Sequence, residues 1–221
     1  MICTSSYSGW KSNEYVAYSI SGDSGRSANY NGRCYLKLAP KMSFWRIWHN
    51  NIGKVHEEEN NKYYVREYWN QVLSKLDPEE VYRELDNSVL LCYEPNTDFC
   101  HRHIVAAWFE LLLGVKVPEL VANDCRIVET AKPINIKEYL EETMKLNIDM
   151  CGFESLRALY LFQKSEKMET IADELEEKNV KCSAYYRQMA SSLRWDADMA
   201  EYEYKKIRRD RQINKKRNVC D

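Results

Sequence analysis

The sequence has few residues that form tight turns, with 7 glycines and 5 prolines among 221 residues. An all-β sandwich needs a turn about every ten residues, so these counts argue against that class and favour helices. The glycine-rich phosphate loops G-x-G-x-x-G and G-x-x-x-x-G-K-[ST] are also missing. We therefore assign neither a dinucleotide fingerprint nor a P-loop.

Long apolar runs and secretion signals are missing as well. No apolar run approaches the roughly 20 residues of a membrane span, and the start, MICTSSYSGW, lacks the charged and apolar parts of a signal peptide. The 8 cysteines include no C-x-x-C pair, which suits neither a disulfide scaffold nor a zinc ribbon. We expect a cytoplasmic protein with reduced thiols and no membrane partner.

Material for a core is plentiful, since hydrophobic residues make up 44% of the chain and aromatic residues 12%. Three stretches rich in β-formers predict strands: Ile2–Ser6, Tyr15–Ile20 and Val89–Cys92. If these strands are parallel, their carboxyl ends meet at one edge of a sheet. The sequence thus predicts an α/β fold with a mostly parallel sheet.

Apolar residues at helical spacing predict a helix over Asn60–Leu76. Asp77 followed by Pro78 predicts the capped start of a second helix. A third helix is expected to start at Phe99, with Thr97 or Asp98 as N-cap, and to end before Gly114.

Composition shifts after Pro118, which predicts two parts: an α/β domain over residues 1–118 and a helical C-terminal extension over residues 119–221. The expected helices of the extension are Lys137–Leu146, Gly152–Phe162, Lys167–Glu177 and about Ala184–Asn214.

The candidate site lies where the third strand meets the following helix. There we predict Cys100, Glu94 and His101 as catalytic residues: Cys100 as a nucleophile favoured by the helix N-terminus, and the other two as proton carriers. Arg102 is expected to grip an anion over the helix start. Packing of Cys100 as a small apolar side chain is an equally weighted alternative.

Further ligand contacts are expected from Ser5, Tyr7 and Cys92, which fall at or just after predicted strand ends. The loop Gly22–Ser27 offers backbone N–H groups that could cradle an anion, although a plain surface loop is the more common outcome. Aromatic residues such as Trp45 and Trp48 are expected to pack in the core rather than to stack bases.

The spacing of the thiols disfavours several chemistries. Cys92 and Cys100 are too far apart in sequence for a thioredoxin-type pair, and a phosphatase loop is missing. We expect no cofactor and no metal; a site of Cys92, Cys100 and His101 remains a minor alternative. Oxidation of the two cysteines to a disulfide is a third possibility.

The net charge of −2 gives no global argument for nucleic acid, but one basic stretch lies at Tyr202–Asn218. Such a helix can bind phosphate backbones, although a solvated helix end is the simpler interpretation. The predicted contacts are Lys205, Lys206, Arg208 and Arg209.

The string Cys92-Tyr93-Glu94, five residues, then Cys100-His101-Arg102 resembles the C-x-E-x5-C-H-R signature of the prokaryotic domain of unknown function family 488. The resemblance covers about residues 1–118. It implies a Rossmann-like α/β domain in which these signature residues cluster beside the first strand ends. Commoner members carry Gly-His after the first strand, where this chain has Ser5-Ser6-Tyr7.

The sequence therefore favours a small α/β enzyme or ligand-binding domain that holds an anionic, nucleotide-like ligand at the Cys100-His101-Arg102 helix start. The expected partner is a nucleotide or another phosphate-bearing small molecule. The alternative is a nucleic-acid or protein interaction module that uses the basic C-terminal helix, with a purely structural Cys/His/Arg cluster.

Overall fold

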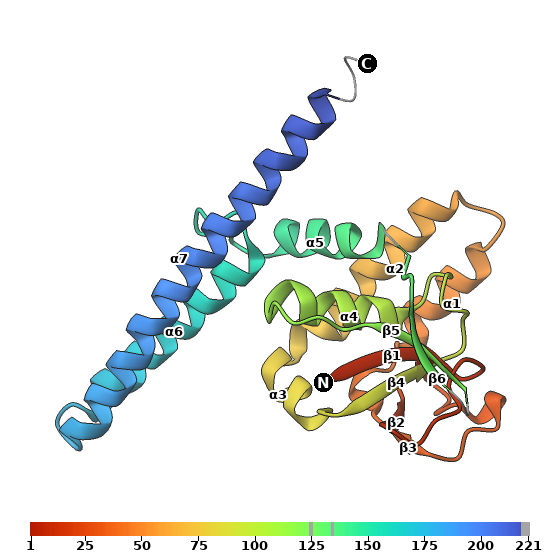
Figure 1. The fold of residues 1–221 in the computed structure, drawn as a ribbon, viewed down its shortest axis with the longest axis horizontal. Coiled ribbons are helices and arrows are strands. Elements are labelled where there is room, and N and C mark those ends of the chain that lie inside the picture. Colours follow the sequence, from red (N-terminus) through yellow and green to blue (C-terminus); the bar gives the residue numbers. More distant parts are fainter. Residues whose placement is uncertain (124–125, 134, 218–221) are drawn as a thin grey trace. The chain divides into compact units, whose positions relative to one another are not determined.

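The computed structural model describes residues 1–123, 126–133 and 135–217, and it divides the chain into two compact units, 1–147 and 148–221. The first unit is built on a six-stranded sheet in the order β3-β2-β4-β1-β5-β6 (Figure 1). The strands are β1 (Ile2–Ser6), β2 (Val16–Ser19), β3 (Arg33–Cys34), β4 (Ser88–Cys92), β5 (Glu119–Asn123) and β6 (Arg126–Thr130).

The central strands are parallel and in close register. β1 pairs with β4 so that Ser6 lies opposite Cys92, and β2 pairs with β4 so that Ser19 lies opposite Leu91. β6 alone among the described strands runs antiparallel to its neighbour. The three predicted strands are confirmed, and their carboxyl ends meet at one edge as expected.

The two faces of the sheet bury different kinds of side chain, because successive residues of a strand point to opposite faces. Cys3, Val89 and Leu91 belong to an apolar core with Leu120 and Trp10 on one face. The intervening residues of β1 and β4 point to the other face, where helix α4 packs on both strands. The candidate site is built on this helical face.

The helices of the first unit come in the positions that the sequence pattern indicates, with shifted ends. Asp77 caps its helix by accepting hydrogen bonds from the backbone N–H groups of Glu79 and Glu80, a contribution of about 1 kcal/mol. The elements are α1 (Met42–Asn51), α2 (Glu57–Gln71), α3 (Pro78–Glu84), α4 (His101–Leu112) and α5 (Asn135–Asn147), with short 3-10 turns at Arg26–Ala28, Leu36–Leu38 and Leu73–Lys75.

Helix α4 begins later than the sequence indicated. Cys100 has the extended backbone of an N-cap (φ −151°, ψ 148°), so neither Thr97 nor Asp98 caps the helix, and Phe99 precedes it. Successive residues of a helix lie about 100° apart around its axis, so a later helix start changes the direction in which the following side chains point. The far end is as expected, because Gly114 adopts the positive φ of 67° that follows many helix ends.

The helical part of the chain also begins later than expected. Residues 119–130 form β5 and β6 of the sheet, and α5 packs on α2 and α4. Along the chain, the first compact unit ends at Asn147 and the second begins at Ile148, whereas the sequence pattern placed the division near residue 118. Strands β5 and β6 are short and carry charged residues, so they lack the apolar pattern that would have revealed them.

The second unit is an antiparallel helical hairpin of α6 (Leu156–Leu175) and α7 (Val180–Arg217). The structure has one continuous helix where the sequence predicted two, Gly152–Phe162 and Lys167–Glu177. Ser165, between the two predicted ranges, is buried, and its hydroxyl donates to the carbonyl of Phe162 within the helix. Small buried residues recur every seven positions on both helices and allow close approach: Ala158, Ser165, Ala172, Ser183, Ala190 and Ala197.

The predicted fold class is confirmed: a mostly parallel sheet with flanking helices, followed by a helical region. None of the described helices is both long and apolar enough to cross a membrane.

Candidate functional site

Four reactive side chains converge where β4 ends and α4 begins. Cys92 is the last residue of β4, Glu94 follows it in the loop, Cys100 is the N-cap of α4, and His101 is the first residue of that helix. We call this group the thiol cluster. Cys92 and Cys100 are 2% and 3% exposed and His101 is 5% exposed, so these three members are almost closed to water, whereas Glu94 is half-buried.

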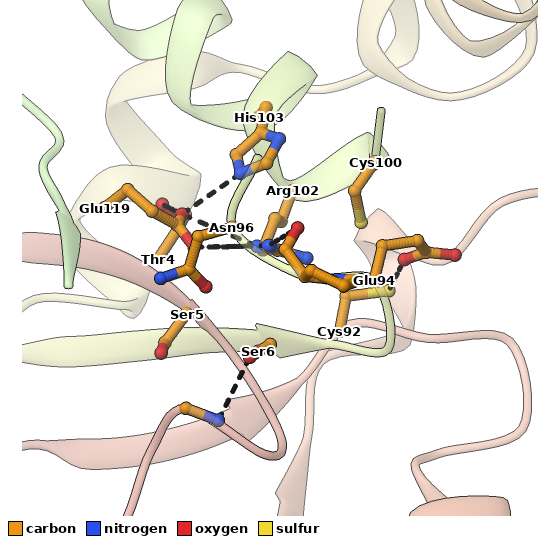
Figure 2. A network of polar contacts seen from close by, with 12 residues as sticks. Thr4, Ser5, Ser6, Cys92, Glu94, Asn96, Cys100, Arg102, His103 and Glu119 are labelled. Carbon is orange, nitrogen blue, oxygen red and sulfur yellow. Dashed lines mark hydrogen bonds and ion pairs between the residues drawn. The ribbon is translucent and has the colours of Figure 1, made fainter. Parts of the chain in front are cut away.

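The thiol cluster is held by short polar contacts. Cys92 Sγ donates to Glu94 Oε2 at 3.3 Å, and this contact is drawn in Figure 2. Cys92 Sγ lies 3.6 Å from His101 Nδ1, and Cys100 Sγ lies 3.9 Å from the same nitrogen. One imidazole nitrogen thus faces both thiols.

The opposite nitrogen of His101 fixes the state of the ring. Nε2 lies 2.9 Å from the backbone carbonyl oxygen of Ile20. A carbonyl only accepts hydrogen bonds, so Nε2 carries the proton. Nδ1 therefore faces Cys92 and Cys100, with a lone pair in the neutral ring and a proton in the charged ring. Burial opposes the charged ring, but Cys100, Glu94 and the Ile20 carbonyl together raise the pKa of His101 above its usual value.

Negative charge in the cluster is favoured at Cys100. Burial opposes ionisation there, but the hydrogen bond from Cys92 and the positive charges of Arg102 and His101 hold the pKa of the Cys100 thiol well below its usual value. Burial and the Cys100 thiolate raise the pKa of Cys92 well above its usual value. The same two causes raise the pKa of Glu94 to about 7.

Glu94 connects the thiol cluster to a cleft of about 1120 Å³ in the first unit. Among the described residues of the cluster, Glu94 lines this cleft and Cys92, Cys100 and His101 lie behind it. The predicted nucleophile therefore lies behind Glu94 and does not border the open space of the cleft.

The cleft combines aromatic walls with acidic groups. Trp48 and Phe99 lie side by side with ring centroids 5.7 Å apart. Lys132 Nζ forms an ion pair with Glu110 Oε1 at 2.6 Å, so much of its positive charge in the cleft is neutralised. The remaining lining includes Tyr139, Asn61, His56 and the acidic Glu57, Glu58, Glu94 and Asp98.

A second buried group, the Glu119 centre, lies next to the thiol cluster and takes up Arg102. Glu119 accepts from Arg102 Nε at 3.2 Å and from Thr4 Oγ1 at 2.6 Å, and His103 Nε2 lies 3.2 Å from the same carboxylate (Figure 2). Arg102 also donates to the carbonyl of Pro95 at 2.9 Å.

Arg102 therefore does not stand over the helix start as a free anion grip. Its side chain is fully buried, and Glu119, rather than a ligand or Glu94, is its ionic partner. The late start of α4 explains this placement, because it turns Arg102 toward β1 and β5.

The side chains of Ser5 and Tyr7 hydrogen-bond to other partners than the thiol cluster, although the backbone N–H of Tyr7 donates to the carbonyl of Cys92 at 2.9 Å. Ser5 Oγ donates to the carbonyl of Leu120 at 2.6 Å, and in Figure 2 its side chain points away from Arg102. The Tyr7 hydroxyl lies 2.6 Å from Ser19 Oγ and 2.8 Å from Ser21 Oγ. The anion site expected between Ser5 and Arg102 is therefore not formed by these side chains.

The loop Gly22–Ser27 does cradle an anion, and the anion is its own Asp23. The carboxylate accepts from the backbone N–H groups of Gly25 at 3.0 Å and Ser27 at 3.1 Å, and from the hydroxyl of Tyr93 at 2.5 Å. Burial opposes ionisation of Asp23, but these donors outweigh it and hold the pKa of the carboxyl well below its usual range.

The basic stretch belongs to α7 in the second unit, and Asn218 at its end lies outside the described residues. Lys205 pairs with Glu201 at 3.0 Å, and Arg208 pairs with Glu154 at 2.5 Å. Lys206 and Arg209 are exposed. Half of the predicted nucleic-acid contacts are thus engaged within the hairpin.

Sequence reasoning missed Glu119 and the lining of the cleft. A glutamate that opens an otherwise apolar strand, as in ELVA, is the one signal that could have pointed to Glu119. Trp48 was expected in the core, but it is half-buried and lines the cleft. No local sequence pattern predicts a cleft that is formed by segments far apart in sequence.

Residues 15–112 match the family model DUF488-N3a, described as the active DUF488-N3 subclade. This match confirms the resemblance suggested by the Cys-Glu-Cys-His-Arg signature, all of whose residues fall within the matched range. No curated protein and no solved structure matches the chain.

Proposed function

We propose, from the premise that residues 15–112 form a DUF488 domain, that this protein is an enzyme whose reactive groups are the thiol cluster. Its ligand would occupy the adjoining cleft. The observation that carries the proposal is the position of Glu94, which lines the cleft and accepts a hydrogen bond from Cys92 at 3.3 Å. The description of the matched subclade as active supports an enzyme rather than a passive fold.

The lining of the cleft suggests the chemical class of the ligand. Trp48 and Phe99 offer aromatic surface for a flat ring. Asn61 offers its amide N–H groups, since its Oδ1 accepts from Trp48 Nε1 at 3.1 Å. Acidic side chains outnumber free cations there, which disfavours a phosphate in the same space. The proposed ligand is therefore nucleoside-like, with its ring in the cleft.

The roles of the signature residues follow from their depth. Glu94 meets the ligand and transfers protons, because it alone among the described cluster residues reaches the cleft. Cys92, Cys100 and His101 lie behind Glu94 and act through it, since Cys92 Sγ donates to the Glu94 carboxylate at 3.3 Å. Arg102 positions the start of α4 through Glu119 and Pro95 rather than binding ligand.

The test is turnover of a panel of nucleosides and nucleotides, followed by mass spectrometry of the products. Glu94→Gln should lower the rate of any active substrate by at least about 100-fold, the usual value of a positioned proton carrier. Glu84→Gln, which changes an exposed carboxylate paired with Lys37, is the matched control and should retain the rate. Equal rates for Glu94→Gln and the parent would contradict the proposed role.

Ligand binding can be read without turnover. Trp48 lines the cleft, so a bound nucleoside should change its fluorescence, and Trp48→Ala should remove that change. A panel in which no nucleoside binds or reacts would overturn the proposed ligand class. We also propose that the protein works in the cytoplasm, where its six described cysteines, all free, stay reduced.

The basic stretch of α7 supports a second candidate, a nucleic-acid contact through the exposed Lys206 and Arg209. Binding of oligonucleotides should then weaken steeply with salt and should be lost on Lys206→Glu with Arg209→Glu. Binding that survives truncation after Met199 would contradict it.

A further inference from the structure

The atoms of the thiol cluster are spaced like the donors of a tetrahedral metal site. With Zn–S near 2.3 Å and Zn–N near 2.0–2.1 Å, the tetrahedral angle separates a sulfur from a nitrogen donor by about 3.6 Å. The observed separations from His101 Nδ1 are 3.6 Å to Cys92 Sγ and 3.9 Å to Cys100 Sγ. All three atoms lie within 4.8 Å of one another.

We propose that Cys92 Sγ, Cys100 Sγ and His101 Nδ1 bind one zinc ion, with the fourth position directed at Glu94 and the cleft. This inference deepens the proposed function, and it rests on that proposal only for the statement that the ion serves a ligand in the cleft. It replaces the expectation, based on thiol spacing in the sequence, that the site holds no metal.

The backbone prepares His101 for this role before any ion arrives. Its Nε2 donates to the carbonyl of Ile20 at 2.9 Å, which leaves Nδ1 as the ring atom that faces the two thiols and can ligate an ion. Metal-bound histidines characteristically donate their other ring N–H to a carboxylate or a backbone carbonyl in this way. The orientation of the ring is therefore set by β2 and not by the ion.

The donor set selects the kind of ion. Two sulfurs and one imidazole suit zinc, whereas calcium and magnesium prefer oxygen ligands. In the bound state Cys92 and Cys100 are both thiolates and His101 Nδ1 is unprotonated, so any proton still carried by these three atoms is released to solvent. Two thiolates then balance the charge of Zn²⁺, so the buried group is neutral and needs no further counter-ion.

The fourth position distinguishes a reactive zinc site from a structural one. Structural sites use four protein ligands, and catalytic sites keep one position for water or substrate. Glu94 Oε2 is 3.3 Å from Cys92 Sγ and the residue lines the cleft, but it is not among the three side chains at ligand spacing, so its expected role is to hold a water bound to the ion. This arrangement brings the ion to the proposed substrate.

The experiment uses the full chain, stripped with a chelator and titrated with Co²⁺, which reports tetrahedral thiolate ligation through its visible and near-ultraviolet absorption. We expect one Co²⁺ per chain with a thiolate charge-transfer band, and its displacement by an equal amount of Zn²⁺. A chain that binds neither ion would overturn the inference.

Matched variants locate the ion. Cys92→Ser and Cys100→Ser should each weaken binding by more than the 10–100-fold that loss of a supporting group costs. Cys3→Ser is the control, because Cys3 is an equally buried thiol on the neighbouring strand β1 and lies on the apolar face. Equal loss in all three variants, or in none, would contradict the assignment.

Alkylation of the unmodified protein covers the case in which a variant does not fold. Zn²⁺ should protect Cys92 and Cys100 from a thiol reagent, as read by mass spectrometry, while the exposed Cys34 and Cys151 react at unchanged rates. A disulfide between Cys92 and Cys100 in the isolated protein, with no protection by zinc, would overturn the metal site in favour of redox chemistry.

These measurements do not depend on turnover. A protein that binds zinc at the cluster but acts on no nucleoside contradicts the proposed function alone. A protein that turns over nucleosides at full rate after complete removal of metal contradicts the statement that the ion serves the ligand in the cleft.

Discussion

The thiol cluster and the Glu119 centre both include side chains from the start of α4, yet the contacts that their buried groups make differ. In the Glu119 centre, a carboxylate accepts from a guanidinium and a hydroxyl, so opposite charges are paired, while Arg102 Nη1 and His103 Nδ1 have no hydrogen-bond partner among the described residues. In the thiol cluster, two sulfurs and a ring nitrogen face the same point. A buried group whose charges are paired indicates a structural role, whereas a buried group whose donor atoms converge on one point indicates a functional role.

The largest expected effect comes from breaking the Glu119 centre. Arg102→Met leaves a buried carboxylate without its cation and should lower the free energy of unfolding by about 3–5 kcal/mol. Urea unfolding measures this loss. Lys37→Met, which removes a cation from the exposed pair with Glu84, is the control and should cost less than about 1 kcal/mol.

If the Arg102→Met protein unfolds as easily as the Lys37→Met protein, the Glu119 centre does not stabilise the fold. The contrast between the two clusters would then fail on its structural side.

The next effect is that of removing the metal. At free zinc about 100-fold above its dissociation constant, binding adds about 2.7 kcal/mol to the folded state, or roughly 5–10 °C in Tm for a chain of this length. Adding a chelator should therefore lower the Tm of the parent protein in a thermal scan. The Cys92→Ser protein should show no such response, and an identical response in both proteins would count against the assigned ligands.

Asp23 lies outside both clusters and tests whether hydrogen bonds alone, without an ionic partner, stabilise an anion. Asp23→Asn weakens the hydrogen bonds from Tyr93, Gly25 and Ser27, and should cost about 2 kcal/mol at pH 7. Because the folded-state pKa of Asp23 lies below the unfolded value of about 3.9, its contribution is complete above that pH. It is lost as the pH falls further.

The parent protein should thus lose stability more steeply than Asp23→Asn in urea unfolding between about pH 4 and pH 2. Parallel pH profiles for the two proteins would show that Asp23 is not held in its charged form.

The smallest effect concerns Tyr7, which was expected to bind ligand. Its hydroxyl contacts Ser19 and Ser21, so Tyr7→Phe should cost about 1 kcal/mol in urea unfolding. Nucleoside binding and the Co²⁺ spectrum should stay unchanged. A loss of nucleoside affinity with unchanged stability would instead return Tyr7 to the ligand site.

The sequence was informative where the pattern is local. The strand that ends at Cys92 and the helix after it could be predicted from a run of apolar residues and a turn, and parallel strand ends bring Cys92 and His101 together by geometry alone. Arg102 was misplaced because a two-residue error in the start of α4 turns a side chain by about half a circle.

What could not be predicted depends on contacts between distant segments. Glu119 meets Thr4 and Arg102 only because β5 pairs beside β1, and no sequence pattern specifies that neighbour. The tautomer of His101 depends likewise on the carbonyl of Ile20, 81 residues away in sequence. The two thiols and His101 lie within one short stretch, residues 92–101, so their proximity is local, whereas the orientation of the His101 ring depends on the distant carbonyl of Ile20.

The most direct test of the contrast is anomalous diffraction at the zinc absorption edge from crystals of the full chain grown with zinc. The account predicts one strong peak in the α/β unit, bounded by Cys92 Sγ, Cys100 Sγ and His101 Nδ1, with Glu94 at its open side. Zinc found only at other positions, or no peak between these three atoms, would contradict it.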